Sequence, residues 1–279
     1  MKSVPLRRRI LLLVAAGIVP VAVMSAVALV ALFVQQRQQA ERAALEIARA
    51  LATAVDAELR RSTAVLEVLS TDSTLDMGDI PGFSERALRT LGTQPYWGRV
   101  LLARPDATPL LNTGVEQGRA IPPVVEPQSF RQAVQTMKPV IGNIARGQRG
   151  EFMVPIRMPV VRNGELKYVL TAVITPNAIL DIVRRQRVPN DWTVSVFDSR
   201  NMRVARNRSN DEYLGTAAAP SLAEIMDGKA EGTGYTRVLE GDMAFSAFVR
   251  VRDTGWTVAM SVPPQFVLSG ARNSLIAYG

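Results

Sequence analysis

The sequence contains no cysteine and no histidine among its 279 residues. Without cysteine there is no disulfide framework and no thiolate for nucleophilic catalysis or zinc binding. Without histidine, the chain lacks the side chain that most often serves as general base and as transition-metal ligand. The glycine-rich signatures of nucleotide-binding loops and the nucleophile elbow of hydrolases are also missing. We therefore expect no catalytic residue, no cofactor and no metal site, and the absences count against a membrane-anchored hydrolase.

One long hydrophobic run, Ile10–Val34, contains no charged residue. About 20 apolar residues in a helix cross the hydrocarbon core of a bilayer, so the run predicts a transmembrane helix. Lys2 and Arg7–Arg9 precede it, and basic residues stay on the cytoplasmic side. We expect residues 1–9 inside, the span in a bacterial inner membrane, and the rest of the chain in the periplasm. A signal peptide cleaved near Ala26–Ala28 is the alternative, but its apolar part would span only about 7–15 residues.

The net charge of +8 arises partly from the basic residues beside this span. Four of the positive charges lie before Ile10, and they are explained by membrane topology. The remaining charges are mixed in sign along the chain, which is typical of a solvated surface. We therefore expect no nucleic-acid partner.

Residues 35–70 contain neither glycine nor proline, and their apolar residues recur every three or four positions. This period predicts one long amphipathic helix that continues from the membrane span. The apolar stripe can pack on the helix's own domain, or it can meet a second copy of the chain. The second interpretation places Ala44, Ala48 and Leu51 in a dimer seam near the membrane, and we expect a homodimer through this helix.

The rest of the chain shows one order of elements twice, in residues 71–187 and 188–266. Each segment has strand, turn, strand, helix and then three antiparallel strands, and the repeat predicts two tandem α+β modules with sheets of about five strands. Asn163-Gly164 is a strong hairpin signal between two of the strands. Residues 267–279 become apolar again and are expected to begin an exit helix toward a second membrane span. The predicted strands are Tyr96–Ala103, Pro109–Asn112, Pro139–Ala145, Glu151–Val160, Leu166–Thr175, Trp192–Asp198, Met202–Arg206, Gly234–Leu239, Met243–Val251 and Trp256–Val262.

Several short stretches resemble double Cache domains, the tandem PAS-like extracytoplasmic sensors of bacterial receptors. The resemblance covers about residues 40–268, and the nearest likeness is to alphaproteobacterial sensor histidine kinases. It implies a membrane-distal module (71–187) that binds a small molecule and a membrane-proximal module (188–266). The order of aromatic and charged residues does not match the amino-acid-binding motif of the family. The stretches that carry the resemblance are Leu101–Thr108, with Ala107 where the family usually has glycine, Leu111–Thr113, Val204–Arg208, Tyr213–Gly215, Gly255–Ala259 and Val262-Pro263.

Alternation along the strands selects candidate ligand contacts in the distal module. In Glu151–Val160, one face is entirely apolar and should meet the long helix, which leaves Arg157 on the face of the pocket. A guanidinium binds carboxylates in a planar, bidentate manner, so Arg99 and Arg157 favour a carboxylate-bearing ligand. The predicted ligand-binding residues are Trp97, Arg99, Arg157, Tyr168 and Thr171, with Trp97 and Tyr168 as apolar walls.

Other roles remain open for these residues. Arginines on strands often lie at the surface, and Trp97 could belong to the core. In the second module, Arg206 and Asp198 are expected to form a structural ion pair. Taken together, the sequence predicts the ligand-sensing region of a transmembrane receptor, and a sensor histidine kinase is the preferred receptor type. A chemoreceptor, a diguanylate cyclase sensor region and an anchored assembly protein without ligand are the alternatives.

Overall fold

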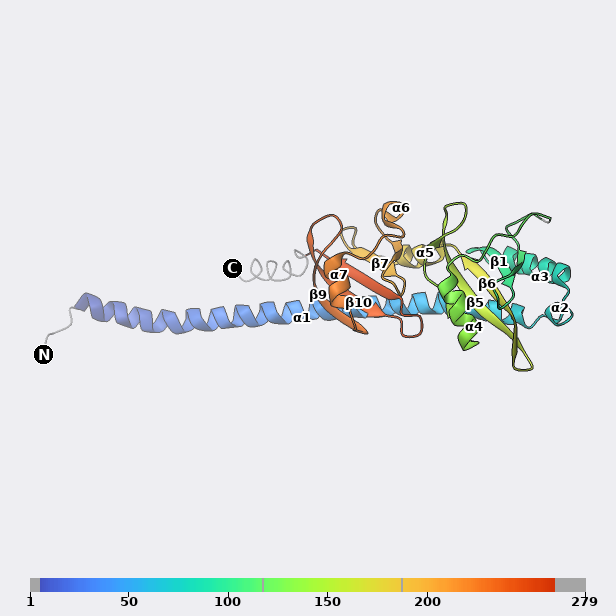
Figure 1. Cartoon of the computed structure of the whole chain (residues 1–279). Helices are drawn as coiled ribbons and strands as arrows, with labels where there is room; N and C mark the ends of the chain where they lie inside the picture. The colour runs from blue at the N-terminus through green and yellow to red at the C-terminus, as the bar shows by residue number, and fades with distance from the viewer. Residues whose placement is uncertain (1–5, 117, 187, 264–279) are drawn as a thin grey trace.

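The structure is a computed structural model that describes residues 6–116, 118–186 and 188–263, with side chains from residue 17 onward except at 33, 36, 37 and 40. Its elements form one very long helix and two α+β modules (Figure 1). The predicted exit segment, residues 267–279, lies outside the described residues.

Helix α1 runs from Leu6 to Ser70 and extends beyond the modules at its N-terminal end (Figure 1). The absence of glycine and proline after Pro20 leaves no residue that would break it. The predicted membrane span, Ile10–Val34, begins among residues whose side chains are not described. Within the part of the chain that is fully described, no helix is both long and apolar enough to cross a membrane.

The first module follows α1 and contains one antiparallel sheet in the order β2-β1-β6-β5-β3, with β4 paired to β5. The turn between β5 and β6 is Asn163-Gly164, and both residues have positive φ (51° and 82°), as the hairpin signal predicts. The elements are α2 (Ser73–Asp76), α3 (Ile80–Thr93), β1 (Trp97–Ala103), β2 (Pro109–Asn112), α4 (Pro127–Thr136), β3 (Val140–Ile141), β4 (Ala145–Arg146), β5 (Phe152–Arg162), β6 (Glu165–Ile174) and α5 (Asn177–Arg185).

The second module repeats this strand order as β8-β7-β11-β10-β9. The prediction of two antiparallel sheets of about five strands is confirmed. Helix α6 was not predicted, because a single turn carries no periodicity. The elements are β7 (Thr193–Phe197), β8 (Arg203–Arg206), α6 (Asn210–Tyr213), α7 (Pro220–Met226), β9 (Glu231–Arg237), β10 (Met243–Arg250) and β11 (Thr257–Val262).

One face of each sheet packs on α1, and the three elements share a single core. On β5 the predicted apolar face is confirmed, with Val154, Ile156 and Met158 buried against α1. We call the sheet face opposite α1 the outer face. Helix α4 covers the outer face of the first sheet and α7 that of the second (Figure 1).

Two expectations from the sequence are wrong. Ala44, Ala48 and Leu51 are at most 2% exposed because they pack within the chain itself, so they cannot also form a dimer seam. Arg206 pairs with Glu240, at 2.7 and 2.9 Å, and not with Asp198. The expected strand Pro139–Ala145 is also interrupted, since β3 and β4 pair with different parts of β5.

Candidate ligand-binding site

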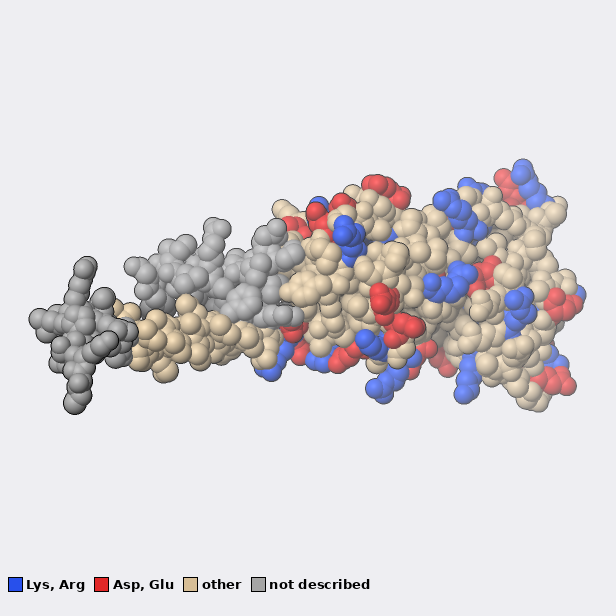
Figure 2. Space-filling model, turned by 60° about the vertical axis from the view of Figure 1, so that its left-hand side comes forward, with Lys and Arg blue, Asp and Glu red and all other residues tan. Residues whose placement is uncertain are grey.

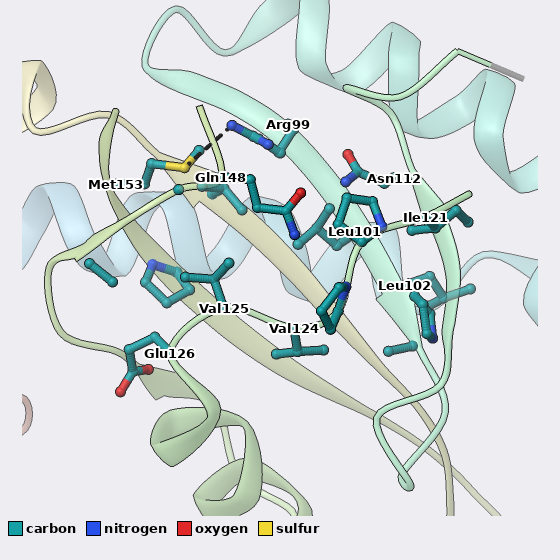
Figure 3. A pocket seen from close by; sticks show the side chains of 18 of the residues that line it. Arg99, Leu101, Leu102, Asn112, Ile121, Val124, Val125, Glu126, Gln148 and Met153 are labelled. Carbon is teal, nitrogen blue, oxygen red and sulfur yellow. Dashed lines mark hydrogen bonds between the residues drawn. The ribbon is translucent and has the colours of Figure 1, made fainter. Parts of the chain in front are cut away.

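A cavity of about 60 Å³ lies on the outer face of the first sheet. That volume has room for several water molecules. Its floor is formed by β1, β2 and β5. One wall is the irregular segment 121–126, and the other comprises β4 and the turn that follows it, residues 145–148 (Figure 3). Most of the lining is apolar, with Leu101, Leu111 and Val124 among its side chains. Such a lining with a few polar groups is typical of small-molecule sites.

Arg99 of β1 lines the cavity, and its charged guanidinium is accessible to solvent. Its side chain is 19% exposed, and it forms an ion pair with Glu151. Nη2 of Arg99 also lies 3.4 Å from Sδ of Met153 (Figure 3). Burial acts to raise the pKa of Glu151, but bonds from its own backbone amide and from Arg99 hold that pKa below its usual range. Glu151 is therefore held as a carboxylate beside Arg99, and an anionic ligand would have to share Arg99 with it.

Arg157 lines the same cavity, but its guanidinium is occupied by the protein. Nε donates to Ser129 Oγ and Nη1 to Thr171 Oγ1, both at 3.1 Å, and Nη2 donates to the carbonyl oxygens of Val125 and Glu126. Burial lowers the pKa of Arg157 to about 10, against the opposing charge of Glu126. With four protein acceptors, Arg157 holds the wall Val125-Glu126 in place.

Glu126 is the N-cap residue of α4 and has a left-handed conformation (φ 55°); its Oε2 accepts a bond from the Ser129 amide at 3.3 Å. The carboxylate points away from the other labelled cavity side chains (Figure 3). Among the described residues, its second oxygen is buried without a hydrogen-bond donor. Glu126 therefore shapes the start of α4 and the cavity wall rather than offering its charge to the cavity.

The structure brings three of the five predicted residues together and separates the other two. Arg99 and Arg157 line the cavity, and Thr171 lies beneath Arg157 on β6. Trp97 is buried on the opposite face, where its Nε1 donates to Ser62 Oγ of α1 at 3.3 Å. Tyr168 also packs on the core shared with α1. Neither side chain therefore lines this cavity. Alternation along β6 directs Tyr168 to the helix, whereas on β1 the register shift between Trp97 and Arg99 turns Trp97 to that face, although simple alternation would place it beside Arg99.

The wall residues and Glu151, the partner of Arg99, were not predicted from the sequence. The segment Ile121–Val125 (IPPVV) forms much of one wall. Its two prolines were a signal that this segment is extended and irregular, because proline disfavours helix both at its own position and at the one before. Nothing in the local sequence indicates that it folds over the sheet, since that depends on Arg157 binding its carbonyl groups.

Solved structures similar to this chain include extracellular domains of histidine kinase candidates and ligand-binding domains of chemoreceptors. The extracellular domain of the histidine kinase candidate rpHK1S-Z16 is 16% identical, with a TM-score of 0.67 over 84% of this chain and 98% of its own. The ligand-binding domain of the Pseudomonas aeruginosa amino-acid chemoreceptor PctB, in complex with L-Gln, is 13% identical, with a TM-score of 0.63 over 86% of this chain and 99% of its own. That of the Pseudomonas fluorescens chemoreceptor CtaA, in complex with L-isoleucine, is 10% identical, with a TM-score of 0.63 over 84% of this chain and 96% of its own.

At these identities the likeness concerns the fold, and at that level the resemblance to double Cache domains is confirmed. The alphaproteobacterial part of the resemblance stays a prediction. Comparison of the sequence with protein-family models gives no match, and neither does comparison with curated proteins.

Proposed function

We propose that this chain is the extracytoplasmic sensing region of a transmembrane signal-transduction receptor, and that the cavity of its first module binds a small organic anion. The observation that carries the proposal is the apolar cavity with the accessible cation Arg99 at its edge. The fold of ligand-binding domains from histidine kinases and chemoreceptors supports a sensing role rather than catalysis. A sensor histidine kinase is the output we favour, and a chemoreceptor or cyclase is the alternative.

The ligand that fits best combines a carboxylate with an apolar body. Arg99 can offer planar paired donors to a carboxylate, and the surrounding Leu101, Leu111 and Val124 would enclose apolar atoms. Glu151 already neutralises Arg99, so a ligand carboxylate must displace or share that bond. This competition predicts modest affinity, and it disfavours ligands with more than one negative charge.

A thermal-shift screen of the full chain in detergent micelles tests the proposal. Monocarboxylic acids, dicarboxylic acids and amino acids are compared, and one class should raise the melting temperature because binding stabilises the folded state. The shift should disappear in Arg99→Ala and persist in Arg104→Ala, whose arginine is exposed on the same module. A flat response to all compounds would instead favour an anchored assembly protein without ligand.

The membrane anchor is part of the same proposal. The uncharged run Ile10–Val34, with basic residues before it, supports an inner-membrane span and a periplasmic ectodomain. Lys, Arg, Asp and Glu side chains are intermixed over the modules, whereas the visible described part of α1 beyond them carries none (Figure 2). Extraction of cell membranes at alkaline pH should leave the chain in the pellet, and its release into the supernatant would contradict the anchor.

We also propose that the receptor is a homodimer through α1, but through a face other than the one first expected. Ala43, Ala50, Ala57 and Ala64 are exposed and recur every seven residues, a spacing that suits close packing of two helices. Because the chain has no native cysteine, Ala57→Cys should cross-link between copies under mild oxidation, whereas the buried Ala48→Cys should not. Spin labels at residue 57 would then show whether a ligand changes the spacing of the helices, and an unchanged spacing would contradict signalling by displacement of α1.

A further inference from the structure

The two walls of the cavity are held in different ways. The wall Val125-Glu126 is bound from within the first module by Arg157. The second wall is the hairpin formed by residues 145–153, which includes β4, the first residues of β5 and the turn between them. This hairpin also carries Glu151, which pairs with Arg99. The position of the hairpin therefore determines whether Arg99 at the cavity edge is neutralised by Glu151.

The residues immediately before this hairpin are bound to the second module. The amide of Ile144 donates to Asp198 Oδ2 at 3.0 Å, and the carbonyl oxygen of Ile144 accepts a bond from Arg200 Nη2 at 3.0 Å. Next to it, Oδ1 of Asn143 accepts bonds from the amide and the hydroxyl of Ser199, at 3.1 and 2.7 Å. These bonds join both backbone groups of Ile144 to the turn between β7 and β8.

Asp198 stabilises this turn. Its side chain is 0% exposed, and its other oxygen, Oδ1, accepts bonds from the amides of Arg200 and Met202, both at 2.9 Å. One carboxylate therefore closes its own turn and binds the first module at the same time. A buried amide that loses its acceptor keeps the full cost of desolvation, so Ile144 has a strong reason to stay bound to Asp198.

A second contact holds the hairpin from its other strand. Gly215 of the second module has φ +74°, and a Cβ atom placed there would lie 2.3 Å from the ring of Phe152. The ring thus rests directly on the backbone at Gly215, and the guanidinium of Arg146 covers it, 4.2 Å from the ring centre. The second module therefore holds the hairpin at two places, through the residues just before its first strand and through Phe152 on its second strand.

We propose that Asp198 is a positioning residue for the ligand cavity, so that the second module sets the place of one cavity wall. The inference rests on the proposed function, because it takes the cavity as the ligand site. The first module then does not form the ligand site on its own. Displacement of the hairpin by a ligand at Arg99 would act on the β7–β8 turn as well as on α1, and by linkage a change at that turn would alter ligand affinity.

Hydrogen exchange of the full chain in detergent micelles tests the inference without any ligand. In Asn143→Ala, which leaves the bonds of Asp198 within its own turn intact, we expect residues 144–151 to exchange at least ten-fold faster while residues 193–206 remain protected. In Asp198→Ala the effect on 144–151 should be larger. The matched control is Asp253→Ala, which removes an exposed acid that pairs with Arg60 of α1 instead of the hairpin.

Two results would overturn the inference. Unchanged exchange of residues 144–151 in both variants would show that the second module does not position the hairpin. Faster exchange that always includes residues 193–206 would show that Asp198 only stabilises its own module. Because no ligand is used, either result leaves the proposed sensing function untouched, and a failed ligand screen leaves this inference standing.

Discussion

The two modules have the same strand order, yet among the described residues their sheets are covered differently: an apolar cavity lies on the outer face of the first sheet, whereas a helix packs directly on that of the second. In the first module, the irregular segment 121–126 covers part of that face and leaves space beneath it. In the second, Leu222 and Met226 of α7 pack directly on Phe197 and Phe248. The difference lies in what covers the sheet rather than in the sheet itself.

The buried arginines of the two modules show the same contrast. Arg157 donates to four oxygen atoms and keeps the cavity wall Val125-Glu126 in place. Arg203 of the second module lies 4.9 Å from the centre of the Phe197 ring, and its Nη1 donates to Thr216 Oγ1 and to the carbonyl oxygen of Ala217, in the segment after α6. Among the described residues it has no carboxylate within 4.0 Å, and its Nε is buried without an acceptor. One arginine organises a site, and the other occupies the corresponding face.

Among the replacements that test this contrast, that of Arg157 should lower the free energy of unfolding most. Arg157→Leu removes the donors to two buried carbonyl groups and two hydroxyl groups, and it leaves the nearby charge of Glu126 uncompensated. We expect the free energy of unfolding to fall by roughly 3–5 kcal/mol, measured by urea titration of the full chain followed by fluorescence. Arg162→Leu, on the same strand but paired at the surface with Asp76, should cost less than about 1 kcal/mol. Equal losses in the two variants would contradict the role of Arg157.

A substitution at the contact between the two modules should lower the free energy of unfolding by an intermediate amount. Gly215→Ala places a methyl group against the Phe152 ring, whereas Gly228→Ala, also at positive φ, meets nothing within 4 Å. Both variants pay for a left-handed backbone conformation, so their difference measures the contact between the modules. We expect Gly215→Ala to be roughly 1–3 kcal/mol less stable than Gly228→Ala in the same titration. Similar stabilities would show that Phe152 can move away and that the hairpin is loosely held.

Much of the fold could be predicted from the sequence because it depends on local patterns. The alternation of β5 identified the face that meets α1, and the Asn163-Gly164 turn fixed the register of its hairpin. The site was less predictable. Trp97 and Tyr168 were placed in the pocket because aromatic residues suit ligand walls, but both face α1. Strand parity explains this for Tyr168, whereas Trp97 is turned by a register shift in β1 that the sequence pattern does not reveal. Glu151 was missed as the partner of Arg99, and Asp198 was assigned to Arg206 instead of Ile144, because the actual contacts join residues about 50 positions apart.

Replacing Arg203 should have the smallest effect, and its sign is informative. Burial, and then the charge of Arg206, lower the pKa of Arg203 to about 10, so the folded state already disfavours this cation. Arg203→Met keeps an unbranched side chain over Phe197 and removes a charge that forms no ion pair among the described residues. The bonds it loses go to Thr216 and to the carbonyl oxygen of Ala217, both exposed residues that water can satisfy. Buried charges are often replaced by apolar groups without loss, so we expect the free energy of unfolding to stay within about 1 kcal/mol or to rise. A loss above about 2 kcal/mol, well beyond a surface substitution, would show that Arg203 organises the second module as Arg157 does the first, and the contrast between a site-forming and a space-filling arginine would fail.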